Sequence, residues 1–175
     1  MITTEDLHEI MPLAKARVNI FAAPLTQAMT KFFIDNPLRQ AAFIAQTAHE
    51  SGELRYVQEI ASGAAYEGRK DLGNTQPGDG KRFKGRGLLQ ITGRHNYSML
   101  RSALGLDVVE HPELLESPEG ACMSAGWWWQ THGLNGLADA EDFERITRRI
   151  NGGLNGQEAR LVYYQRAKRV LGILT

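Results

Sequence analysis

Residues 36–52 read NPLRQAAFIAQTAHESG, and this stretch predicts an apolar helix that ends in a carboxylic acid. Asn36 is a favourable N-cap, and Pro37 suits the first helical position, where a missing N–H costs nothing. The small and apolar residues that follow form a broad face for packing. Gly52 can adopt the left-handed conformation that ends a helix. Glu50 therefore lies in the last turn, at the edge of a core.

A second motif, GRGLLQITGRHNY at residues 85–97, combines the glycines of a turn with a series of hydrogen-bonding side chains. Gln90, Thr92, Asn96 and Tyr97 belong to it. Glycine-rich turns bring polar side chains close to the backbone, so we expect this segment to line a cleft that binds sugars. Thr92 also suits a helix N-cap, and a threonine could serve in both roles.

An acid beside a polar cleft favours hydrolysis of a glycosidic bond, a reaction that commonly uses two carboxylates. The downstream candidates are Glu53, Glu59, Glu67 and Asp71. On one continuous helix the step from Glu50 to Glu59 corresponds to about 900° of rotation, which would put the two on opposite faces. We therefore expect the chain to turn back after Gly52 and residues 59–69 to form a loop over the cleft. An inverting enzyme would hold the carboxyl groups roughly 6.5–9.5 Å apart, with a water between them.

Four ordered motifs resemble glycoside hydrolase family 19, the chitinase family, and more closely its phage and bacterial endolysins. They are His49-Glu50-Ser51-Gly52, residues 85–93, Asn96-Tyr97 and Ile150-Asn151-Gly152-Gly153. The resemblance implies inverting hydrolysis of β-1,4-linked N-acetylated sugars, with Glu50 as the proton donor and Thr92 beside the attacking water. The positions that it assigns to sugar contacts are Gln90, Asn96, Tyr97, Asn151 and Arg160.

The sequence leaves two candidates for the second catalytic carboxylate, Glu59 and Glu67. In the endolysin branch the second glutamate follows the first by nine residues, which favours Glu59 as the catalytic base. Alignment backwards from residues 85–87 favours Glu67 instead, and we expect Glu67 to be a substrate-binding residue or a substitute base. Two departures concern the family pattern: the chain lacks the disulfide-bonded loops of plant chitinases, and it has Glu53 where a second glycine is common.

Composition fits one domain, and we expect residues 1–175 to form a single catalytic domain. Hydrophobic residues make up 42% of the chain, which suffices for a core, and 20 basic residues balance 20 acidic ones. We therefore expect no nucleic-acid partner. Five basic residues lie close together in the sequence and have two interpretations. They form either a local basic face that binds a polyanionic wall polymer or ordinary solvated charge. These residues are Lys81, Arg82, Lys84, Arg86 and Arg94. Cys122 has no cysteine partner, and no ligand spacing of the His-Glu-x-x-His kind indicates a metal, so we expect no metal and no cofactor.

The remainder predicts a mainly helical protein. Expected helices run from Thr3 or Thr4 to Met11, Pro24 to Ile34, Thr92 to Leu104, Ser117 to Gly133, Asp139 to Arg149 and Gln157 to Leu171. Residues 127–129 are tryptophans that point in different directions around a helix, so at most one is expected to stack on a sugar. Residues 82–92 are expected to form a β-hairpin. The expected architecture is a lysozyme-like α+β fold, a single helical domain with a small β-hairpin lobe flanking a substrate cleft.

These inferences favour a peptidoglycan-degrading endolysin that hydrolyses glycan strands and lyses the cell wall. Chitin hydrolysis is the alternative, and a non-catalytic sugar-binding protein is a third interpretation. The N-terminus lacks the basic region and apolar core of a signal peptide, and no stretch approaches the ~20 apolar residues of a membrane span. We expect a monomer that does not insert in membranes, accumulates in the cytoplasm and acts on the wall in the periplasm after release.

Overall fold

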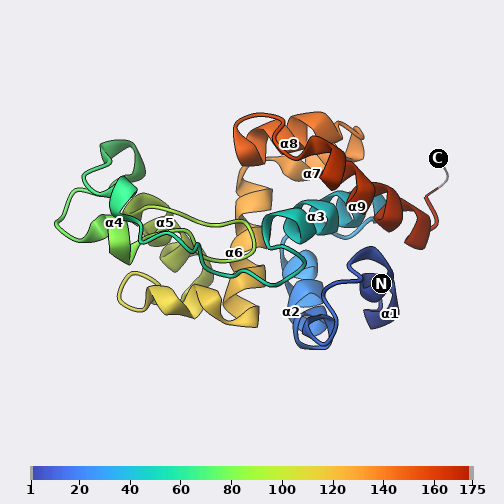
Figure 1. Ribbon diagram of the computed structural model, residues 1–175, viewed down its shortest axis with the longest axis horizontal. Coiled ribbons are helices and arrows are strands. Elements are labelled where there is room, and N and C mark those ends of the chain that lie inside the picture. The colour runs from blue at the N-terminus through green and yellow to red at the C-terminus, as the bar shows by residue number, and fades with distance from the viewer. Residues whose placement is uncertain (1, 174–175) are drawn as a thin grey trace.

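The computed structural model describes residues 2–173, and helices dominate it (Figure 1). The α-helices are α1 (Thr4–Ile10), α2 (Arg17–Lys31), α3 (Pro37–Glu50), α4 (Asp79–Arg82), α5 (Arg94–Leu104), α6 (Pro118–Thr131), α7 (Leu134–Asp139), α8 (Phe143–Asn151) and α9 (Gln157–Val170). Short 3₁₀ helices are η1 (Ala64–Tyr66), η2 (Lys70–Leu72) and η3 (Pro112–Glu116). The expected mainly helical fold is confirmed.

Helix α6 lies at the centre of the molecule, between two groups of elements (Figure 1). On one side are α4, α5 and the loops next to them; on the other are α1, α2, α3 and α9. Trp127 and Trp129 of α6 are buried in the core, whereas Trp128 is partly exposed. Two of the three consecutive tryptophans therefore pack in the core, as expected, and the third indole lies near the surface.

Helix α3 is the buried element that carries Glu50. The Asn36 side chain accepts a hydrogen bond from the Arg39 N–H at 2.9 Å, and Pro37 occupies the first turn. Residues 41–48 are buried, and α3 packs most extensively against α9. Phe43 meets Trp129 edge to face, with ring centroids 5.3 Å apart. A helix held on several sides fixes the position of the residue at its end.

Three expected helix boundaries were wrong. Helix α2 begins at Arg17 and contains Pro24 in its interior, because its buried face continues through Val18 and Phe21 toward the core. Helix α5 begins at Arg94 after Gly93, so Thr92 is not its N-cap. The helix expected from Asp139 begins only at Phe143, where Asp142 is the N-cap, and Asp139 is instead the last residue of α7 and pairs with Arg39.

The expected β-hairpin at residues 82–92 is not formed. The only β pairing among residues 2–173 is a pair of isolated bridges, Gln58 with Arg86 and Arg86 with Ile91. The segment between them turns sharply, with positive φ at Gly87 and Gln90. The backbone of residues 85–91 thus pairs with two partners at single positions, and the polar side chains project from an irregular wall rather than from a sheet.

In the turn after α3, Glu53 occupies the position where a second glycine is common in the family that the motifs resemble. Glu53 has φ +58°, in the left-handed region, and is buried. Its carboxylate accepts hydrogen bonds from the Leu13 N–H at 2.5 Å and from the Tyr163 hydroxyl at 2.9 Å. Burial, with the Glu53 contact, raises the pKa of Tyr163 to about 12. The carboxylate therefore ties the end of the α3 segment to the start of the chain and to α9.

Glu53→Ala is expected to lower the free energy of unfolding by about 2–3 kcal/mol, because a partly buried N–H and a partly buried hydroxyl lose their acceptor. Glu53→Gly should cost about 1 kcal/mol less than Glu53→Ala, since glycine tolerates the positive φ. Urea denaturation of both variants measures the difference. Equal stabilities for the two variants, or two variants as stable as the wild type, would contradict this account.

Candidate active site

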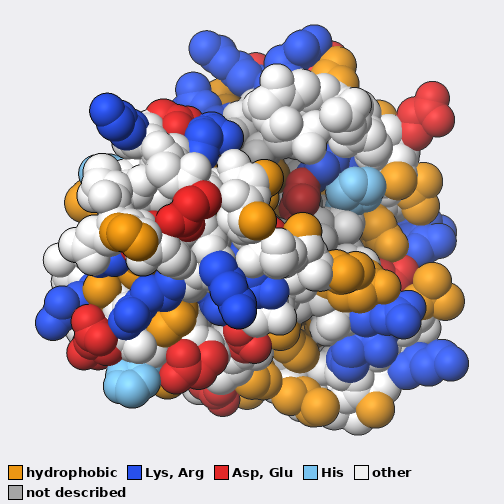
Figure 2. All heavy atoms as spheres, turned by 60° about the vertical axis from the view of Figure 1, so that its left-hand side comes forward, with side chains coloured by type: hydrophobic (Ala, Val, Ile, Leu, Met, Phe, Trp, Pro, Cys, Tyr) orange, Lys and Arg blue, Asp and Glu red, His pale blue; other side chains and the backbone are white. Residues whose placement is uncertain are grey.

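Glu50 and Glu59 lie in the same open cleft. Its lining residues are Glu50, Tyr56, Gln58, Glu59, Ile60, Ala61, Tyr66 and Gln90, and its volume is about 390 Å³. The space-filling view shows a hollowed surface with a recessed acidic side chain next to a histidine (Figure 2). The turn that the sequence required after Gly52 thus returns the chain to Glu50.

Glu50 ends α3 and is held by a buried arginine. Arg160 Nη2 lies 2.5 Å from Glu50 Oε1, and the arginine side chain is 2% exposed, against 22% for the glutamate. Burial, and then the positive charge of Arg160, lower the pKa of the neighbouring His49. A neutral imidazole leaves the guanidinium as the cation next to Glu50. The acid is therefore accessible from the cleft but fixed from within the protein.

Glu59 is anchored by one carboxylate oxygen and leaves the other unpaired. Glu59 Oε2 accepts hydrogen bonds from the Gly85 N–H at 3.0 Å and from the Tyr66 hydroxyl at 3.1 Å. Burial, together with this contact, raises the pKa of Tyr66. Glu59 Oε1 is buried without a protein donor. A base that must bind water needs a free oxygen of this kind.

Gly85 is required by this arrangement. A Cβ at position 85 would lie 2.8 Å from Glu59 Oε2 and 2.8 Å from Gln90 Oε1. Because such a contact is too short for carbon against oxygen, only glycine lets the backbone N–H approach the carboxylate. Gly85, the first glycine of the motif at residues 85–97, therefore allows the hydrogen bond that holds the Glu59 carboxylate in place.

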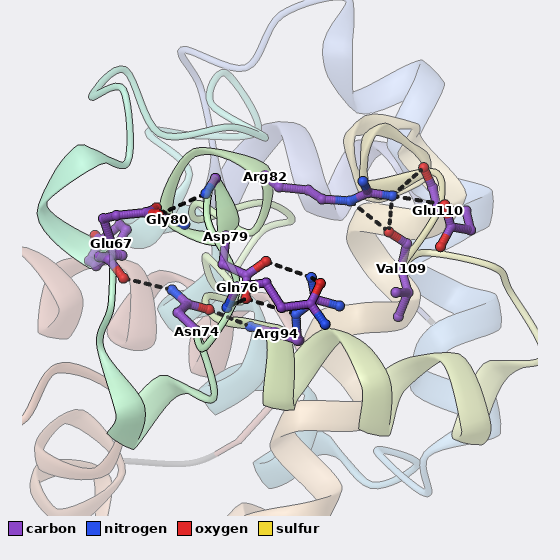
Figure 3. A network of polar contacts seen from close by, with 11 residues as sticks. Glu67, Asn74, Gln76, Asp79, Gly80, Arg82, Arg94, Val109 and Glu110 are labelled. Carbon is purple, nitrogen blue, oxygen red and sulfur yellow. Dashed lines mark hydrogen bonds and ion pairs between the residues drawn. The ribbon is translucent and has the colours of Figure 1, made fainter.

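Glu67 has a different environment and does not line the cleft. Its two oxygens accept hydrogen bonds from the backbone N–H groups of Gly78 at 2.7 Å and Gly80 at 2.8 Å (Figure 3). These donors lie at the start of α4, where an anion is favoured by the helix dipole. Both oxygens stabilise the α4 loop, which favours Glu59 over Glu67 as the base, and the expected sugar contact at Glu67 stays a prediction.

Next to the Glu67 loop, Asp79 and Arg94 form an ion pair that ties α4 to α5 (Figure 3). Arg94 Nε lies 2.8 Å from Asp79 Oδ2, and the Arg94 N–H donates to Asn74 Oδ1 at 2.8 Å. The Arg94 hydrogen bond lowers the pKa of the Asp79 carboxyl below its usual range. The loop that ends at the 85–97 motif is thus held by a polar network rather than by a large apolar core.

Gln90, Thr92 and Asn96 lie together in an adjoining pocket that also includes Trp128 and Ile150. Gln90 lines both this pocket and the cleft, so the two are neighbours. The Thr92 hydroxyl donates to Gln90 O at 2.9 Å, and Asn96 Nδ2 donates to Thr92 O at 2.9 Å. The structure brings these three predicted residues together, but Thr92 is not in the cleft that holds the carboxylates.

Tyr97 and Arg160 are buried side chains behind the site. Tyr97 is fully buried, donates to Lys84 O at 2.8 Å and accepts from Arg86 Nη1 at 3.1 Å. Burial raises the pKa of Tyr97 to about 12. Arg160 is buried behind its contact with Glu50. Both side chains support the site from the core, and their assignment as sugar contacts stays a prediction.

Asn151 is exposed at the last position of α8, next to Ile150, which lines the adjoining pocket. Its assignment as a sugar contact stays a prediction. The sequence contained no sign of Tyr56 and Gln58 in the cleft, and it placed Ile60 and Tyr66 in a loop over the cleft without assigning them a role. The only signal for Tyr66 was an aromatic residue in a loop of small residues, and nothing in the pattern of the chain placed it beside Glu59.

Acidic partners neutralise three of the five basic side chains between residues 81 and 94. Arg82 pairs with Glu110, Arg86 with Glu116, and Arg94 with Asp79. Basic and acidic side chains are interspersed over the face seen in Figure 2. Of the two interpretations, the structure supports paired and solvated charge.

Residues 2–173 contain no group of three or more histidine, cysteine or acidic side chains that could hold a metal ion. None of their helices is long and apolar enough to cross a bilayer.

A helical fold whose cleft is lined by two glutamates, one at a helix end and one on a loop, has the pair of carboxylates that glycoside hydrolases use. Residues 35–140 match the family model described as Glyco_hydro_19, chitinase class I. A glycosyl hydrolase family 19 domain-containing protein of Haemophilus influenzae is 32% identical over 161 residues, which cover 74% of this chain and 78% of that protein. The chain therefore belongs to glycoside hydrolase family 19.

The plant relatives are longer. An endochitinase of Arabidopsis thaliana is 37% identical over 140 residues, and the match covers 76% of this chain but 48% of the plant protein. Among solved structures, chitinase C from Streptomyces griseus has a TM-score of 0.81 at 22% identity, covering 99% of this chain and 78% of that one. A bacterial family 19 chitinase has a TM-score of 0.80 at 25% identity, covering 99% and 96%. This chain shares their fold.

Proposed function

We propose that this glycoside hydrolase cleaves β-1,4 bonds between N-acetylated sugars with inversion at the anomeric carbon. Glu50 is the general acid and Glu59 is the general base. The observation that carries the proposal is the single cleft lined by both carboxylates, with Glu59 Oε1 buried and free of protein donors. A water bound to that oxygen is the nucleophile that a single-displacement reaction requires.

In the proposed reaction Glu50 donates its proton to the glycosidic oxygen as the bond to the anomeric carbon breaks. Glu59 Oε1 takes a proton from the water, whose oxygen forms the new bond on the opposite face of the sugar. Tyr66 and Gly85 keep Glu59 Oε2 in place during this step. Thr92 stays a candidate for orienting the water, which requires its hydroxyl to rotate away from Gln90 O.

Chitin is the substrate that the relatives favour. Several of the plant proteins that match this chain are named endochitinases, and the fold is that of bacterial chitinases. Peptidoglycan is the second candidate, because the spacing of Glu50 and Glu59 resembles the endolysin branch and its strands also have β-1,4-linked N-acetylated sugars. Under this second candidate the protein would accumulate in the cytoplasm and act on the wall after release.

Purified protein is tested on a chitin hexamer and on purified peptidoglycan, with new reducing ends as the readout. We expect new ends on at least one substrate, α-anomeric products by proton NMR at early times, and no loss of rate with a chelator. β-Anomeric products would contradict inversion. Binding to both glycans without new ends would instead support the sugar-binding alternative, and the substrate with the higher kcat/KM distinguishes the two enzyme candidates.

A further inference from the structure

A polar network of side chains from α3, α8 and α9 holds Glu50. Arg160 Nη2 contacts Glu50 Oε1 at 2.5 Å, and Arg160 Nη1 donates to Gln46 Oε1 at 2.5 Å. Gln46 Nε2 donates in turn to Thr147 Oγ1 at 2.9 Å, and Thr147 donates to Phe143 O at 3.2 Å. Gln46 and Thr147 are fully buried and Arg160 nearly so. The network therefore links α3, α8 and α9 through buried side chains and meets the cleft only at Glu50.

Gln46 and Glu50 hold Arg160 from the same face of α3. They are four residues apart, so their side chains lie one above the other on the helix. One partner of the guanidinium is a neutral amide oxygen and the other is a carboxylate. Within residues 2–173, Glu50 is the only carboxylate within ion-pair distance of Arg160. The remaining contact of the arginine is from Nε to the backbone oxygen of Asn155 at 3.3 Å.

We propose that Gln46 is a positioning residue that sets the pH range in which Glu50 works as the acid. This inference rests on the proposed role of Glu50. Gln46 fixes Nη1 without neutralising the guanidinium, so the full positive charge of Arg160 is directed at Glu50. A nearby cation favours the carboxylate form, whereas a general acid must keep its proton. The partner at position 46 therefore determines the highest pH at which Glu50 remains protonated.

Other ionisable groups near Glu50 come from each neighbouring segment. On α3 there is His49, on α9 Arg160, and on the loop that completes the cleft Glu59, Tyr56 and Tyr66. Burial and the charge of Arg160 lower the pKa of His49 and keep it neutral, and burial raises the pKa of Tyr66. Glu59 is shared by every variant tested below, so its effect is constant. A change at position 46 consequently acts on Glu50 through Arg160 and through direct repulsion.

Gln46→Glu is the sharpest test, because it changes charge with little change of shape. A carboxylate at position 46 would share Arg160 and repel Glu50 one turn away, and both effects favour the protonated acid. We expect the alkaline limb of the kcat–pH profile to move to higher pH by about one unit. The matched control is Gln40→Glu, which adds the same charge on α3 at a position without side-chain hydrogen bonds, and should leave the limb in place. An unchanged limb in a folded Gln46→Glu protein overturns the proposal.

A second measurement separates this inference from the proposed activity. Glutamate carboxyl carbons are labelled with ¹³C, the Glu50 signal is assigned by its loss in Glu50→Gln, and its titration is followed in wild type and Gln46→Glu. A titration that moves to higher pH supports the network even if no substrate is hydrolysed, in which case only the proposed function fails. A titration that coincides with wild type refutes the inference even if the enzyme is active.

Thr147 supplies a variant for the case in which Gln46→Glu does not fold. Thr147→Val removes the acceptor that anchors the Gln46 amide, and we expect kcat to fall about tenfold with KM unchanged, because the arginine loses its fixed partner. Thr147→Ser keeps the hydroxyl and should restore kcat. Equal kcat values in Thr147→Val and wild type, or a loss in Thr147→Ser equal to that in Thr147→Val, would contradict the positioning role.

Discussion

Glu50→Gln is expected to lower kcat on the preferred glycan by about 10²–10⁴-fold. The amide keeps the shape of the side chain and an oxygen for Arg160 but has no proton to donate. KM should change little, because proton transfer to the leaving oxygen occurs only in the transition state. Steady-state kinetics on the chitin hexamer measures both quantities.

Stability has to be followed in the same experiment. Arg160 is buried and loses its carboxylate in this variant, so the free energy of unfolding should fall by about 1–3 kcal/mol, while the protein stays folded at room temperature. Glu119→Gln, at an exposed site on α6, is the matched control and should retain wild-type kcat. A folded Glu50→Gln protein with near wild-type kcat would mean that another group donates the proton.

Glu59→Gln and Glu67→Gln are expected to have opposite effects. Glu59→Gln should lower kcat by about 10²–10⁴-fold, because an amide oxygen is too weak a base to activate water. Glu67→Gln should leave kcat unchanged and lower the free energy of unfolding by about 1 kcal/mol, since the Gly78 and Gly80 N–H groups lose an ionised acceptor. Activity assays and urea denaturation on the pair measure both effects.

Azide rescue sharpens the assignment of Glu59. A small anion in the cleft can replace the carboxylate of a missing base, and it should raise the rate of Glu59→Gln but not that of Glu50→Gln, in which the acid is missing. A large loss of kcat in Glu67→Gln, with an active Glu59→Gln, would reverse the assignment and require the α4 loop to open during catalysis.

The sequence predicted most of the elements that hold the site because their signals are local. Asn36, Pro37 and Gly52 marked the limits of α3 through backbone rules that act over one turn. Ser117 likewise caps α6 as expected, and Gly105 ends α5 with φ +68°. The boundary of α2 was misjudged at Pro24, because burial of a long apolar face outweighed the local preference of proline for a first turn.

Side-chain environments at the site were harder to predict. Tyr97 and Arg160 were assigned to the sugar from motifs, yet both are buried. A motif shows that a residue type is needed, and it does not tell a group that touches substrate from one that holds the group that does. The sequence could not choose between Glu59 and Glu67 for a similar reason. Both follow Glu50 in one loop, and they differ only in the hydrogen-bond donors that the fold brings to them.

By itself, the amino-acid sequence determined that this is a helical protein with an acid at the end of an apolar helix and a glycine-rich polar segment downstream. Helix periodicity, capping and turn chemistry act between neighbours in the chain, so they can be inferred from its order. Only the tertiary structure decided that Gly85 approaches Glu59, that Glu67 closes the α4 loop and that Gln46 and Thr147 stand behind Arg160. Those contacts join residues 13 to 114 positions apart, and they depend on how the helices pack.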